Sequence, residues 1–551
     1  MKKILLLLFI LSNCVAISQP TCEWAYIPLG SNTTHNTIYN LKTDHSGNTI
    51  VVGKLLGSAD MDPATGPADT SFSSVGYNWY ISKTSIAGKL EWIHYFQNNS
   101  QIAFFEFKGL EINSRNEIVV CGNFYGMVDF DLSDNGVDTL RSHFSTYPDY
   151  FIAKYDSLGN YAWAINIGDS TTNDIQIQSM ALLPNDNIII SANPNGVLDV
   201  DPSNAVHNSI GNNANIICYD NNGAYVWNNH ISPLFTYGVP VQSIDCDASG
   251  NSYIASVGYY ELTISKFDNV GMYMWSKKIG NFSANGRVDP QTILVNKTTS
   301  EFYIAGTFGG TVDFDPGVGV INRTSSSGFF QDGFIAKYDF DMNLIWLNTF
   351  HGEVSFGSNS LDFNTTGVAA VGSLKGNIDF GNGLVFSSPT NTNSFYLNID
   401  TSGYALDAFA INGNGKFYGL STTINQSFVV IGNITSTTDM DPGTPVYSLN
   451  ATAANFFTAV YHTTLPTITS EHAKNLMIEV FPNPSKNSFN IKVDASLIGS
   501  NYKCFDYTGK MIKEGKIESL YTDIQLEGSA AGIYFLKLNG KTTETLKLIK
   551  S

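Results

Sequence analysis

Short alternations of apolar and polar residues, separated by turn residues, run along most of the chain. The clearest example is Phe151 to Trp163, FIAKYDSLGNYAW, in which two apolar stretches flank a Ser-Leu-Gly turn and predict a β-hairpin. Gly159 stands where such a turn favours a positive φ angle. We find no sustained 3.6-residue period of the kind that marks a long amphipathic helix. The pattern therefore predicts an all-β chain.

Altered copies of this hairpin recur along the chain. Six complete copies and a truncated seventh lie at residues 79–92, 151–163, 216–227, 264–275, 334–346, 395–407 and 456–461. Met342 replaces the turn glycine in the fifth copy, and Asp407 replaces the final Trp in the sixth. A second hairpin precedes each copy, so a repeat holds four short strands in roughly 50 to 70 residues. We expect a seven-bladed β-propeller over residues 19–462.

The truncated seventh copy lacks its return strand, and a matching strand stands at the other end of the chain. Residues 22–30, CEWAYIPLG, resemble the return strands of the other copies in their Trp and in the alternation that follows. We therefore expect the N-terminal strand to pair with the last blade and close the ring. Trp24 then joins the tryptophans that end the other hairpins, which favours packing between blades over ligand stacking.

The first 18 residues predict a signal peptide. Lys2 and Lys3 precede an apolar run at residues 4–11, and Ala16-Ile17-Ser18 forms a cleavage site that leaves Gln19 first. An alternative is a lipidated Cys14, although the preceding Asn does not fit the usual pattern for lipidation. No later apolar run is long enough to span a bilayer, so the sequence predicts no transmembrane segment.

The amino-acid composition excludes some classes of binding partner and of stabilising site. The formal net charge is -18 and the sequence pI about 4.8, so a nucleic acid or an anionic lipid surface would be repelled. Six cysteines occur without any CxxC spacing, and five remain if Cys14 leaves with the signal peptide. This set argues against a disulfide framework and against a zinc site.

The repeat pattern of the sequence ends at residue 462. Residues 463–474 are polar and predict a linker, and residues 475–551 carry a different set of alternating strands that predicts a separate small β-sandwich. Distinctive motifs here are Val480 to Pro484 (VFPNP), Phe505 to Gly515, Gly532 to Lys537 (GIYFLK) and the basic ending Lys547 to Ser551.

These motifs resemble the C-terminal, type A-like sorting domain of cargo of the Bacteroidetes type IX secretion system. The resemblance covers about the last 75 residues, and the matching motif positions are Pro482, Asn483, Pro484, Gly532, Tyr534, Lys547 and Lys550. It implies export through the inner membrane, recognition of residues 475–551 by the outer-membrane translocon, and release or attachment at the cell surface. The repeats also resemble bacterial β-propeller repeats, which implies a fold and little about activity.

Paired aspartates follow the second strand of most repeats. The pairs are Asp60 and Asp62, Asp129 and Asp131, Asp199 and Asp201, Asp313 and Asp315, and Asp439 and Asp441. Two carboxylates two residues apart on an extended segment point the same way, and hard oxygen ligands suit Ca²⁺. Aspartate is equally a turn former, because its side chain accepts backbone N–H groups. The sequence favours the turn role and keeps calcium as the one candidate cofactor.

The topology of a propeller places these aspartates and the long loops beside them on one face of the disc, and we expect binding there. The sequence contains neither HExxH nor GxSxG, and the histidines recur at no fixed repeat position, so no catalytic residue is predicted. The sequence favours a secreted or surface binding or adhesion module for a glycan, another extracellular polymer or a protein. The alternative is an extracellular hydrolase or lyase that uses the Asp-rich loop face.

Overall fold

The chain divides into two compact parts, Met1–Thr464 and Leu465–Ser551, which we describe separately. In the N-terminal part the computed structural model describes residues 20–28, 36–56, 59–62, 71–72, 77–96, 102–133, 136–143, 147–168, 175–194, 196–209, 214–231, 241–258, 261–280, 286–326, 332–423, 427–443, 446–451 and 455–462. In the C-terminal part it describes residues 479–481, 485–486, 488–493, 498–506, 510–519, 521–526, 528–539 and 543–550. The predicted signal peptide (1–18) and linker (463–474) lie outside the described residues.

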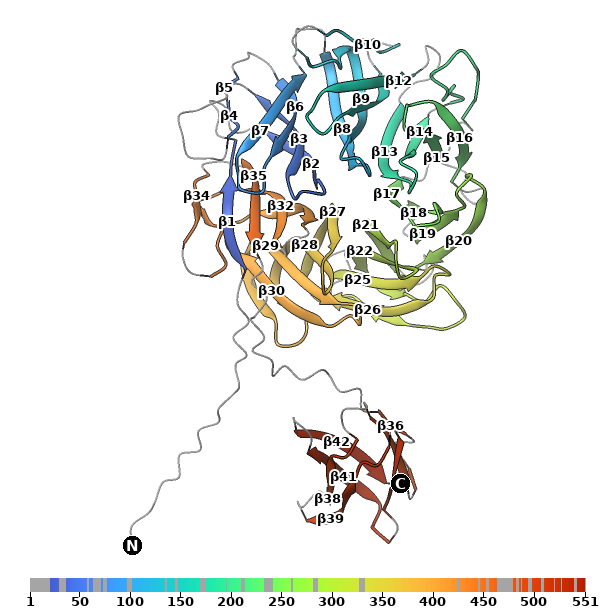
Figure 1. Ribbon diagram of the computed structural model, residues 1–551, viewed down its shortest axis with the longest axis vertical. Coiled ribbons are helices and arrows are strands. Elements are labelled where there is room, and N and C mark those ends of the chain that lie inside the picture. Colours follow the sequence, from blue (N-terminus) through green and yellow to red (C-terminus); the bar gives the residue numbers. More distant parts are fainter. Residues whose placement is uncertain are drawn as a thin grey trace. The chain divides into compact units, whose positions relative to one another are not determined.

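The described residues form β-strands and no helix, as the alternating pattern predicts. In the N-terminal part the strands make antiparallel groups of four, which we call units and number along the chain. Figure 1 shows the units arranged around a common centre, with the first strand of each unit innermost. An eight-stranded sheet divides into units 6 and 7, because a single parallel bridge, Asn359 to Gly419, joins them.

Units 1 to 4 have the following strands. Unit 1 is β2 (Thr37–Thr43), β3 (Thr49–Leu56), β6 (Tyr77–Thr84) and β7 (Leu90–Phe96). Unit 2 is β8 (Ile102–Ile112), β9 (Ile118–Asp129), β11 (Asp149–Tyr155) and β12 (Tyr161–Ile167), with β10 (Thr139–Arg141) beside β9. Unit 3 is β13 (Ile175–Leu182), β14 (Ile188–Pro194), β15 (Asn215–Tyr219) and β16 (Tyr225–His230). Unit 4 is β17 (Val241–Cys246), β18 (Ser252–Gly258), β19 (Glu261–Phe267) and β20 (Tyr273–Ile279).

Units 5 to 7 follow the same order. Unit 5 is β21 (Arg287–Asn296), β22 (Glu301–Gly309), β25 (Asp332–Asp339) and β26 (Leu344–Phe350). Unit 6 is β27 (Glu353–Phe363), β28 (Gly367–Asp379), β29 (Val385–Asp400) and β30 (Ala405–Ile411). Unit 7 is β31 (Lys416–Thr422), β32 (Ser427–Ile434), β35 (Asn455–His462) and β1 (Thr21–Tyr26). Short ribbons are β4 (Ala59–Asp60) with β5 (Ser71–Phe72), β23 (Thr311–Asp313) with β24 (Asn322–Thr324), and β33 (Thr438–Asp439) with β34 (Ser448–Leu449).

The fourth strand of unit 7 comes from the start of the chain. β1 pairs antiparallel with β35, with Thr21 opposite His462 and Trp24 opposite Val460. The expected pairing of the N-terminal strand with the last repeat is therefore present. Each innermost strand contacts the innermost strand of the next unit, in the order β2, β8, β13, β17, β21, β27, β31. The last of them, β31, contacts the first, β2.

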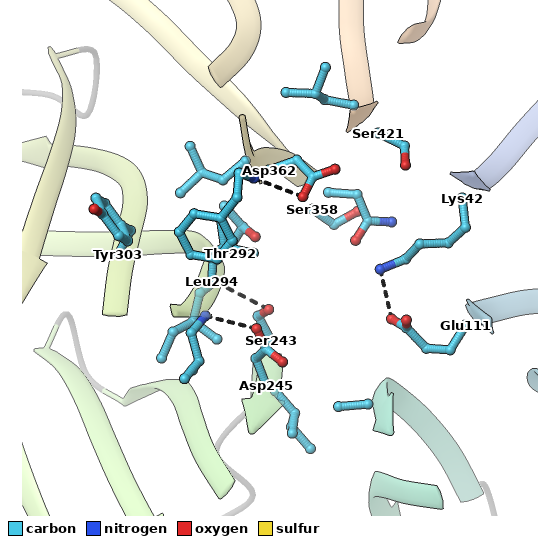
Figure 2. A pocket seen from close by; sticks show the side chains of 18 of the residues that line it. Lys42, Glu111, Ser243, Asp245, Thr292, Leu294, Tyr303, Ser358, Asp362 and Ser421 are labelled. Carbon is cyan, nitrogen blue, oxygen red and sulfur yellow. Dashed lines mark hydrogen bonds and ion pairs between the residues drawn. The ribbon is translucent and has the colours of Figure 1, made fainter. Parts of the chain in front are cut away.

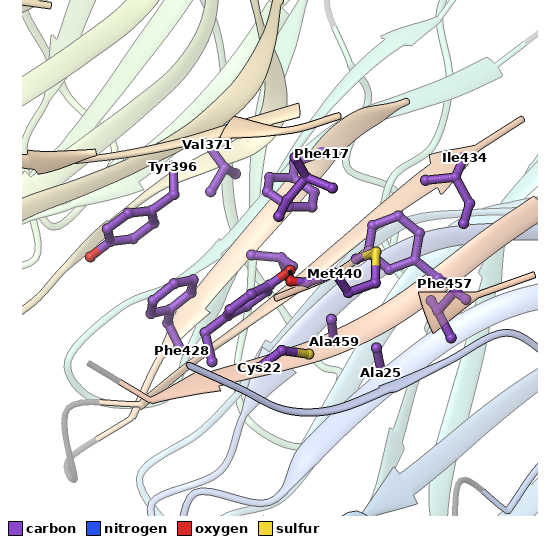
Figure 3. Close-up of a cluster of buried hydrophobic side chains, with 14 of the residues drawn as sticks. Cys22, Ala25, Val371, Tyr396, Phe417, Phe428, Ile434, Met440, Phe457 and Ala459 are labelled. Carbon is purple, nitrogen blue, oxygen red and sulfur yellow. Dashed lines mark hydrogen bonds between the residues drawn. The ribbon is translucent and has the colours of Figure 1, made fainter. Parts of the chain in front are cut away.

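Apolar side chains fill the space between neighbouring units. One cluster joins units 6 and 7 and includes Tyr396, Phe428 and Phe457, together with Cys22 and Ala25 of β1 (Figure 3). Another joins units 7 and 1 and includes Trp24, Val460 and Leu41. Because each described cluster of this part draws on two adjacent units, burial of apolar area stabilises the units only together.

Each hairpin tryptophan packs on the turn of the next unit. In unit 2 this turn is held by Asp156, whose Oδ1 accepts the N–H groups of Leu158 and Asn160 at 2.8 and 2.9 Å. Gly159 has a φ angle of 84°, as expected for this turn position. A Cβ atom on Gly223 would lie 3.0 Å from the ring of Trp163, so the neighbouring indole leaves no room for a side chain.

The C-terminal part is built from two small sheets. One sheet has the order β36 (Glu479–Phe481), β37 (Ser488–Lys492), β40 (Tyr521–Gln525). The other has the order β39 (Met511–Lys516), β38 (Asn501–Asp506), β41 (Gly532–Asn539), β42 (Thr543–Lys550). Phe489, Ile524, Leu536 and Leu548 from the two sheets share one buried core. Across the described residues of both parts, no helix is long and apolar enough to cross a membrane.

Candidate functional site

A cavity of about 640 Å³ lies where the innermost strands of the units meet, and residues of β2, β8, β13, β17, β21, β27 and β31 all line it (Figure 2). The strands reach the cavity because each unit presents its first strand to the centre. Its charged lining residues are Lys42, Lys108, Glu111, Asp245, Lys297 and Asp362. The cavity therefore combines positive and negative groups on one polar wall.

Lys42 and Glu111 form an ion pair across the wall, between β2 and β8. Lys42 Nζ lies 2.9 Å from Glu111 Oε1, and the two side chains keep 33% and 24% of their exposure. Burial alone would lower the pKa of Lys42, but the Glu111 carboxylate outweighs it and the pKa stands above its ordinary value. Lys42 thus stays protonated at neutral pH, and the pair remains accessible from the cavity.

Asp245 lies on β17, beside the first strand of the next unit. Its Oδ2 accepts the backbone N–H of Val295 on β21 at 2.8 Å. Burial raises the pKa of Asp245, opposed by the positive charge of Lys297. Burial alone would lower the pKa of Lys297, but Asp245, Cys246 and Glu111 together outweigh burial and raise it.

Asp362 on β27 repeats this arrangement at the next pair of units. Its Oδ2 accepts the N–H of Thr422 on β31 at 2.7 Å, and burial raises the pKa of this carboxyl group. Ser421 Oγ in turn accepts the N–H of Thr43 on β2 at 3.1 Å. Side chains of one innermost strand therefore hydrogen bond to the backbone of the next, which ties the centre of the ring together.

The sequence pattern did not predict these cavity residues. The sequence pattern that could have identified them is a charged or hydroxyl residue directly after an apolar residue in the first strand of a repeat. It occurs as Leu41-Lys42, Leu110-Glu111, Leu361-Asp362 and Leu420-Ser421. Alternation along a strand puts the polar member on the opposite face from its neighbour. Only the arrangement of the units shows that this second face lines a shared cavity.

The paired aspartates lie at the ends of second strands and hold their own turns. In each pair the first carboxylate accepts the N–H of the second Asp, at 3.1 Å (Asp60 and Asp62), 3.2 Å (Asp129 and Asp131), 3.1 Å (Asp199 and Asp201), 3.0 Å (Asp313 and Asp315) and 3.1 Å (Asp439 and Asp441). Four of the first carboxylates also accept an N–H from the returning chain, at Asp138, His207, Ile321 and Tyr447. These bonds are those of a turn-forming aspartate.

A tyrosine holds each of four such turns against its unit. Tyr155, Tyr219, Tyr338 and Tyr461 donate their hydroxyl hydrogens, at 2.8 to 2.9 Å, to the carbonyl of the residue between the two aspartates. Unit 4, which lacks the aspartate pair, has Phe267 at the equivalent position and therefore no hydroxyl. In units 2, 3, 5 and 7 the aspartate pair and the tyrosine thus act together, whereas unit 1 has the pair with Thr84 at the tyrosine position.

Calcium at these turns stays a prediction. Within the described ranges, no group of three or more His, Cys, Asp or Glu side chains is placed to hold a metal ion. Ca²⁺ takes six to eight oxygen ligands, and one carboxylate oxygen of each pair is already engaged by backbone N–H groups.

The central cavity and the aspartate turns lie toward opposite ends of the units. The cavity lining includes Asn296 to Thr298 and Asn364 to Gly367, where first strands turn into second strands, whereas the aspartates follow the second strands. In an antiparallel pair these two ends are opposite. The aspartate loops, where the sequence suggested a binding site, therefore do not coincide with the central cavity.

Four of the predicted motif positions lie in the second sheet of the C-terminal part. Gly532 begins β41, and Tyr534 donates its hydroxyl hydrogen to the carbonyl of Ala530 at 2.6 Å. Lys550 is buried and its Nζ donates to the carbonyls of Leu526 and Ser529, each at 2.7 Å. Lys547 is in β42 opposite Phe535. Pro482, Asn483 and Pro484 lie outside the described residues.

Comparison with known proteins identifies this C-terminal part. Residues 479–551 match the family described as the secretion system C-terminal sorting domain. The match supports the chain as cargo of the type IX secretion system and indicates export to the cell surface or the extracellular space. Beta-agarase A of Zobellia galactanivorans is 36% identical over 67 residues, which are 12% of this chain and 12% of that protein. The chain thus spans a small fraction of this curated relative, and the agarase name describes that protein alone.

Solved structures resemble the chain only distantly. A protein of unknown function from Dyadobacter fermentans has a TM-score of 0.35 and 9% identity, covering 81% of this chain and 100% of its own. The dihydro-heme d1 dehydrogenase NirN has a TM-score of 0.35 and 10% identity, covering 92% of this chain and 80% of its own. Likenesses at these scores carry no argument about function.

Proposed function

We propose that this chain is a type IX secretion cargo in which residues 19–462 form a seven-bladed β-propeller that binds an extracellular polymer or protein. The four-stranded units, the apolar clusters shared by neighbouring units and the pairing of β1 with β35 support the propeller. The sorting domain supports delivery to the cell surface or beyond it. In this proposal the propeller is the functional part, and residues 475–551 serve its export through contact with the translocon.

The observation that carries the binding proposal is the polar central cavity. Its volume, about 640 Å³, lies in the range of ordinary ligand sites, roughly 300–1,000 Å³. The Lys42–Glu111 pair and the carboxylates of Asp245 and Asp362 line it with donors and acceptors on rigid strands. Such a wall suits a polar, hydroxyl-rich group, so we propose a glycan or a projecting residue of another surface polymer as the ligand.

A pair of variants on the mature full-length chain tests the site. We expect Lys42→Gln with Glu111→Gln to remove binding to any glycan that a glycan array selects for the wild type. Asp313→Asn, at an aspartate turn toward the other end of unit 5, serves as the matched control and should retain that binding. Loss of binding in the control and not in the cavity variant would place the site at the aspartate loops and contradict the cavity proposal.

The alternative function is an extracellular hydrolase or lyase. The observation that favours it is the raised pKa of both Asp245 and Asp362 in one cavity, because shifted carboxyl groups are common in active sites. Each carboxylate also accepts a backbone N–H from the neighbouring strand, which gives it a structural role as well. Turnover of an array-selected glycan by the wild type, abolished in Asp245→Asn or Asp362→Asn, would establish the enzyme and replace the binding module.

Calcium is a separate, weaker proposal at the aspartate pairs. It predicts that titration with Ca²⁺ releases or absorbs heat and that EDTA lowers the melting temperature. Both the heat and the effect of EDTA should be smaller in Asp313→Asn. An unchanged melting temperature in EDTA, with no heat of binding, would remove calcium and leave the turn role alone.

A further inference from the structure

A second cavity, of about 430 Å³, lies toward the end of the units where the paired aspartates stand. Most of its lining comes from the starts of the innermost strands of units 5, 6 and 7 and from the second halves of β22 and β28. Its volume lies in the range of ordinary ligand sites, roughly 300–1,000 Å³. The central cavity is lined by later residues of the same innermost strands, so the two cavities lie toward opposite ends of the units.

The shape of β27 separates the two cavities. Its pairing with β28 is interrupted after Phe356, and the residues that follow reach unit 7, where Asn359 forms a bridge to Gly419. Residues 353–356, before the interruption, line the second cavity, whereas residues 358–359 line the central one. β27 therefore presents different side chains to two separate spaces.

Uncharged polar side chains on regular strands line the second cavity. They are Gln291 on β21, Thr307 on β22, Ser355 on β27 and Ser373 on β28. Ser355 Oγ and Ser373 Oγ hydrogen bond to each other at 2.9 Å. Because paired strands hold these residues, their amide and hydroxyl groups form a fixed set of donors and acceptors. Such a set suits the hydroxyl groups of a sugar.

Four charged residues line the same cavity, and three of them lie near a group of opposite charge. Lys375 Nζ lies 3.6 Å from Glu353 Oε2, and Asp289 Oδ2 lies 4.0 Å from Nη2 of Arg287 in the same strand. The fourth is Lys416, which is exposed at the start of β31 and forms no ion pair within the part of the chain that the structure describes. Lys416 therefore leaves the cavity with an uncompensated positive charge.

The backbone around Lys416 is fixed by contacts between units 6 and 7. The N–H of Gly415 donates to the carbonyl of Thr392 at 2.9 Å, and Thr392 itself lines the cavity. Lys416 pairs with Asn433 of β32. In a chain of formal net charge -18, a cavity whose uncompensated charge is positive attracts a negative ligand that the rest of the protein would repel.

We propose that this second cavity binds a sugar unit carrying one negative group, a uronate carboxylate or a sulfate ester, of an acidic polysaccharide. Lys416, with Lys375 beside the same cavity, binds the anionic group through charge-assisted hydrogen bonds. Gln291, Thr307 and Ser355 bind the hydroxyl groups of the sugar. The site is distinct from the central cavity, and it does not depend on the binding function proposed for that cavity.

Calorimetric titration of the mature full-length protein at low ionic strength tests the site. The probes are tetragalacturonate, a sulfated κ-carrageenan tetrasaccharide and neutral cellotetraose. We expect at least one of the two anionic probes to bind, and to bind more tightly than cellotetraose. The tighter of the two identifies the anionic group as carboxylate or sulfate.

Two lysine variants separate the cavity from the overall charge of the protein. Lys416→Gln should weaken binding of the anionic probe by about tenfold, the effect of one lost hydrogen bond to a charged group. Lys89→Gln is the matched control, because it removes an exposed lysine from the hairpin turn of unit 1 and changes the net charge equally. It should bind as the wild type does. Equal melting temperatures of the two variants would show that weaker binding is not a loss of folding.

A third variant tests the polar wall without changing any charge. Gln291→Ala should weaken binding of the same probe several-fold, since it removes an amide from the cavity. Binding of neither anionic probe, equal binding of cellotetraose, or equal affinities of Lys416→Gln and Lys89→Gln would overturn the proposal. Lys42→Gln with Glu111→Gln should leave this binding unchanged. Its loss in that variant, with Lys416→Gln unaffected, would place the anionic sugar in the central cavity and also overturn the proposal.

Discussion

The joints between units fall into two kinds, and the difference shows what a tryptophan needs in order to hold two units together. At a joint such as that between units 5 and 6, Trp346 packs on a glycine turn and donates to its carbonyl, while Lys337 donates to the same carbonyl. At the joint between units 6 and 7, Asn398 and Asp407 hold the two equivalent positions. The third and fourth strands of unit 7 come from opposite ends of the chain, so no hairpin turn connects them. A tryptophan is useful where a compact turn offers it a surface and a carbonyl.

The joint between units 7 and 1 is of the first kind. Trp24 of β1 donates its indole hydrogen to the carbonyl of Ile86 at 3.1 Å, in the turn of unit 1. Trp24 is therefore equivalent to Trp163 and Trp346, although it comes from the other end of the chain. The N-terminal strand thus completes an ordinary joint with unit 1.

The largest expected effect follows from removing β1. Deleting residues 20–28 exposes β35 as an edge strand and removes Trp24 from the cluster between units 7 and 1. We expect the N-terminal part to lose several kcal/mol of stability, since one buried large aromatic alone contributes roughly 3–5 kcal/mol. Thermal unfolding of the mature chain and of the deletion variant measures this, and equal melting temperatures would show that β1 does not stabilise unit 7.

A smaller effect is expected from a single tryptophan joint. Trp346→Ala removes a half-buried indole and its hydrogen bond to Thr401. We expect a loss of about 2–3 kcal/mol, below the roughly 3–5 kcal/mol of a fully buried aromatic. Denaturant unfolding with Asp407→Ala as the comparison separates the two kinds of joint. If both substitutions destabilise equally, the distinction between the joints has no energetic meaning.

A glycine pair separates the packing of a joint from its backbone conformation. Gly403 and Gly381 have φ angles of 91° and 89°, but only at Gly403 would a Cβ meet the Trp346 ring, and nothing lies within 4 Å of a Cβ on Gly381. Both Gly→Ala variants should lose about 1 kcal/mol from backbone strain. Gly403→Ala should lose a further 1 kcal/mol or so by overpacking. Equal losses in denaturant unfolding would mean that the indole moves aside freely.

The smallest effect is the pH dependence of Asp407. Burial raises its folded-state pKa to about 6, above the usual unfolded value of about 3.9. The folded state then binds the proton more tightly, so this group contributes stability below pH 4 that is lost as the pH rises through 6. The melting temperature of the wild type should show this loss, of a few degrees at most because Asp407 is partly exposed, and that of Asp407→Asn should not.

Local sequence predicted much of the architecture. The hairpin turns, their glycines, the repeated tryptophans and the partner of β35 could be recognised because each depends on residues close together or on exact repetition. The role of Asp313 and Asp315 in a turn could also be predicted from the sequence, because the hydrogen-bond partners of Asp313 lie within a few residues of it.

The cavity could not be predicted in the same way. Asp245 and Asp362 accept N–H groups from strands that follow them by some fifty to sixty residues, and nothing local indicates that contact. Asp407 was visible in the sequence as a replaced Trp, but its place at the joint with the unit that both chain ends build appears only once β1 is paired with β35. Function here depends on such long-range placement.

Hydrogen exchange in β1 of the mature protein tests most directly the claim that the N-terminal strand closes the ring of units. We predict that the amides of residues 21–26 which bond to β35 exchange as slowly as those of β26, the equivalent strand of unit 5. Exchange of residues 21–26 at the rate of an unfolded segment, with β26 still protected, would contradict the closure.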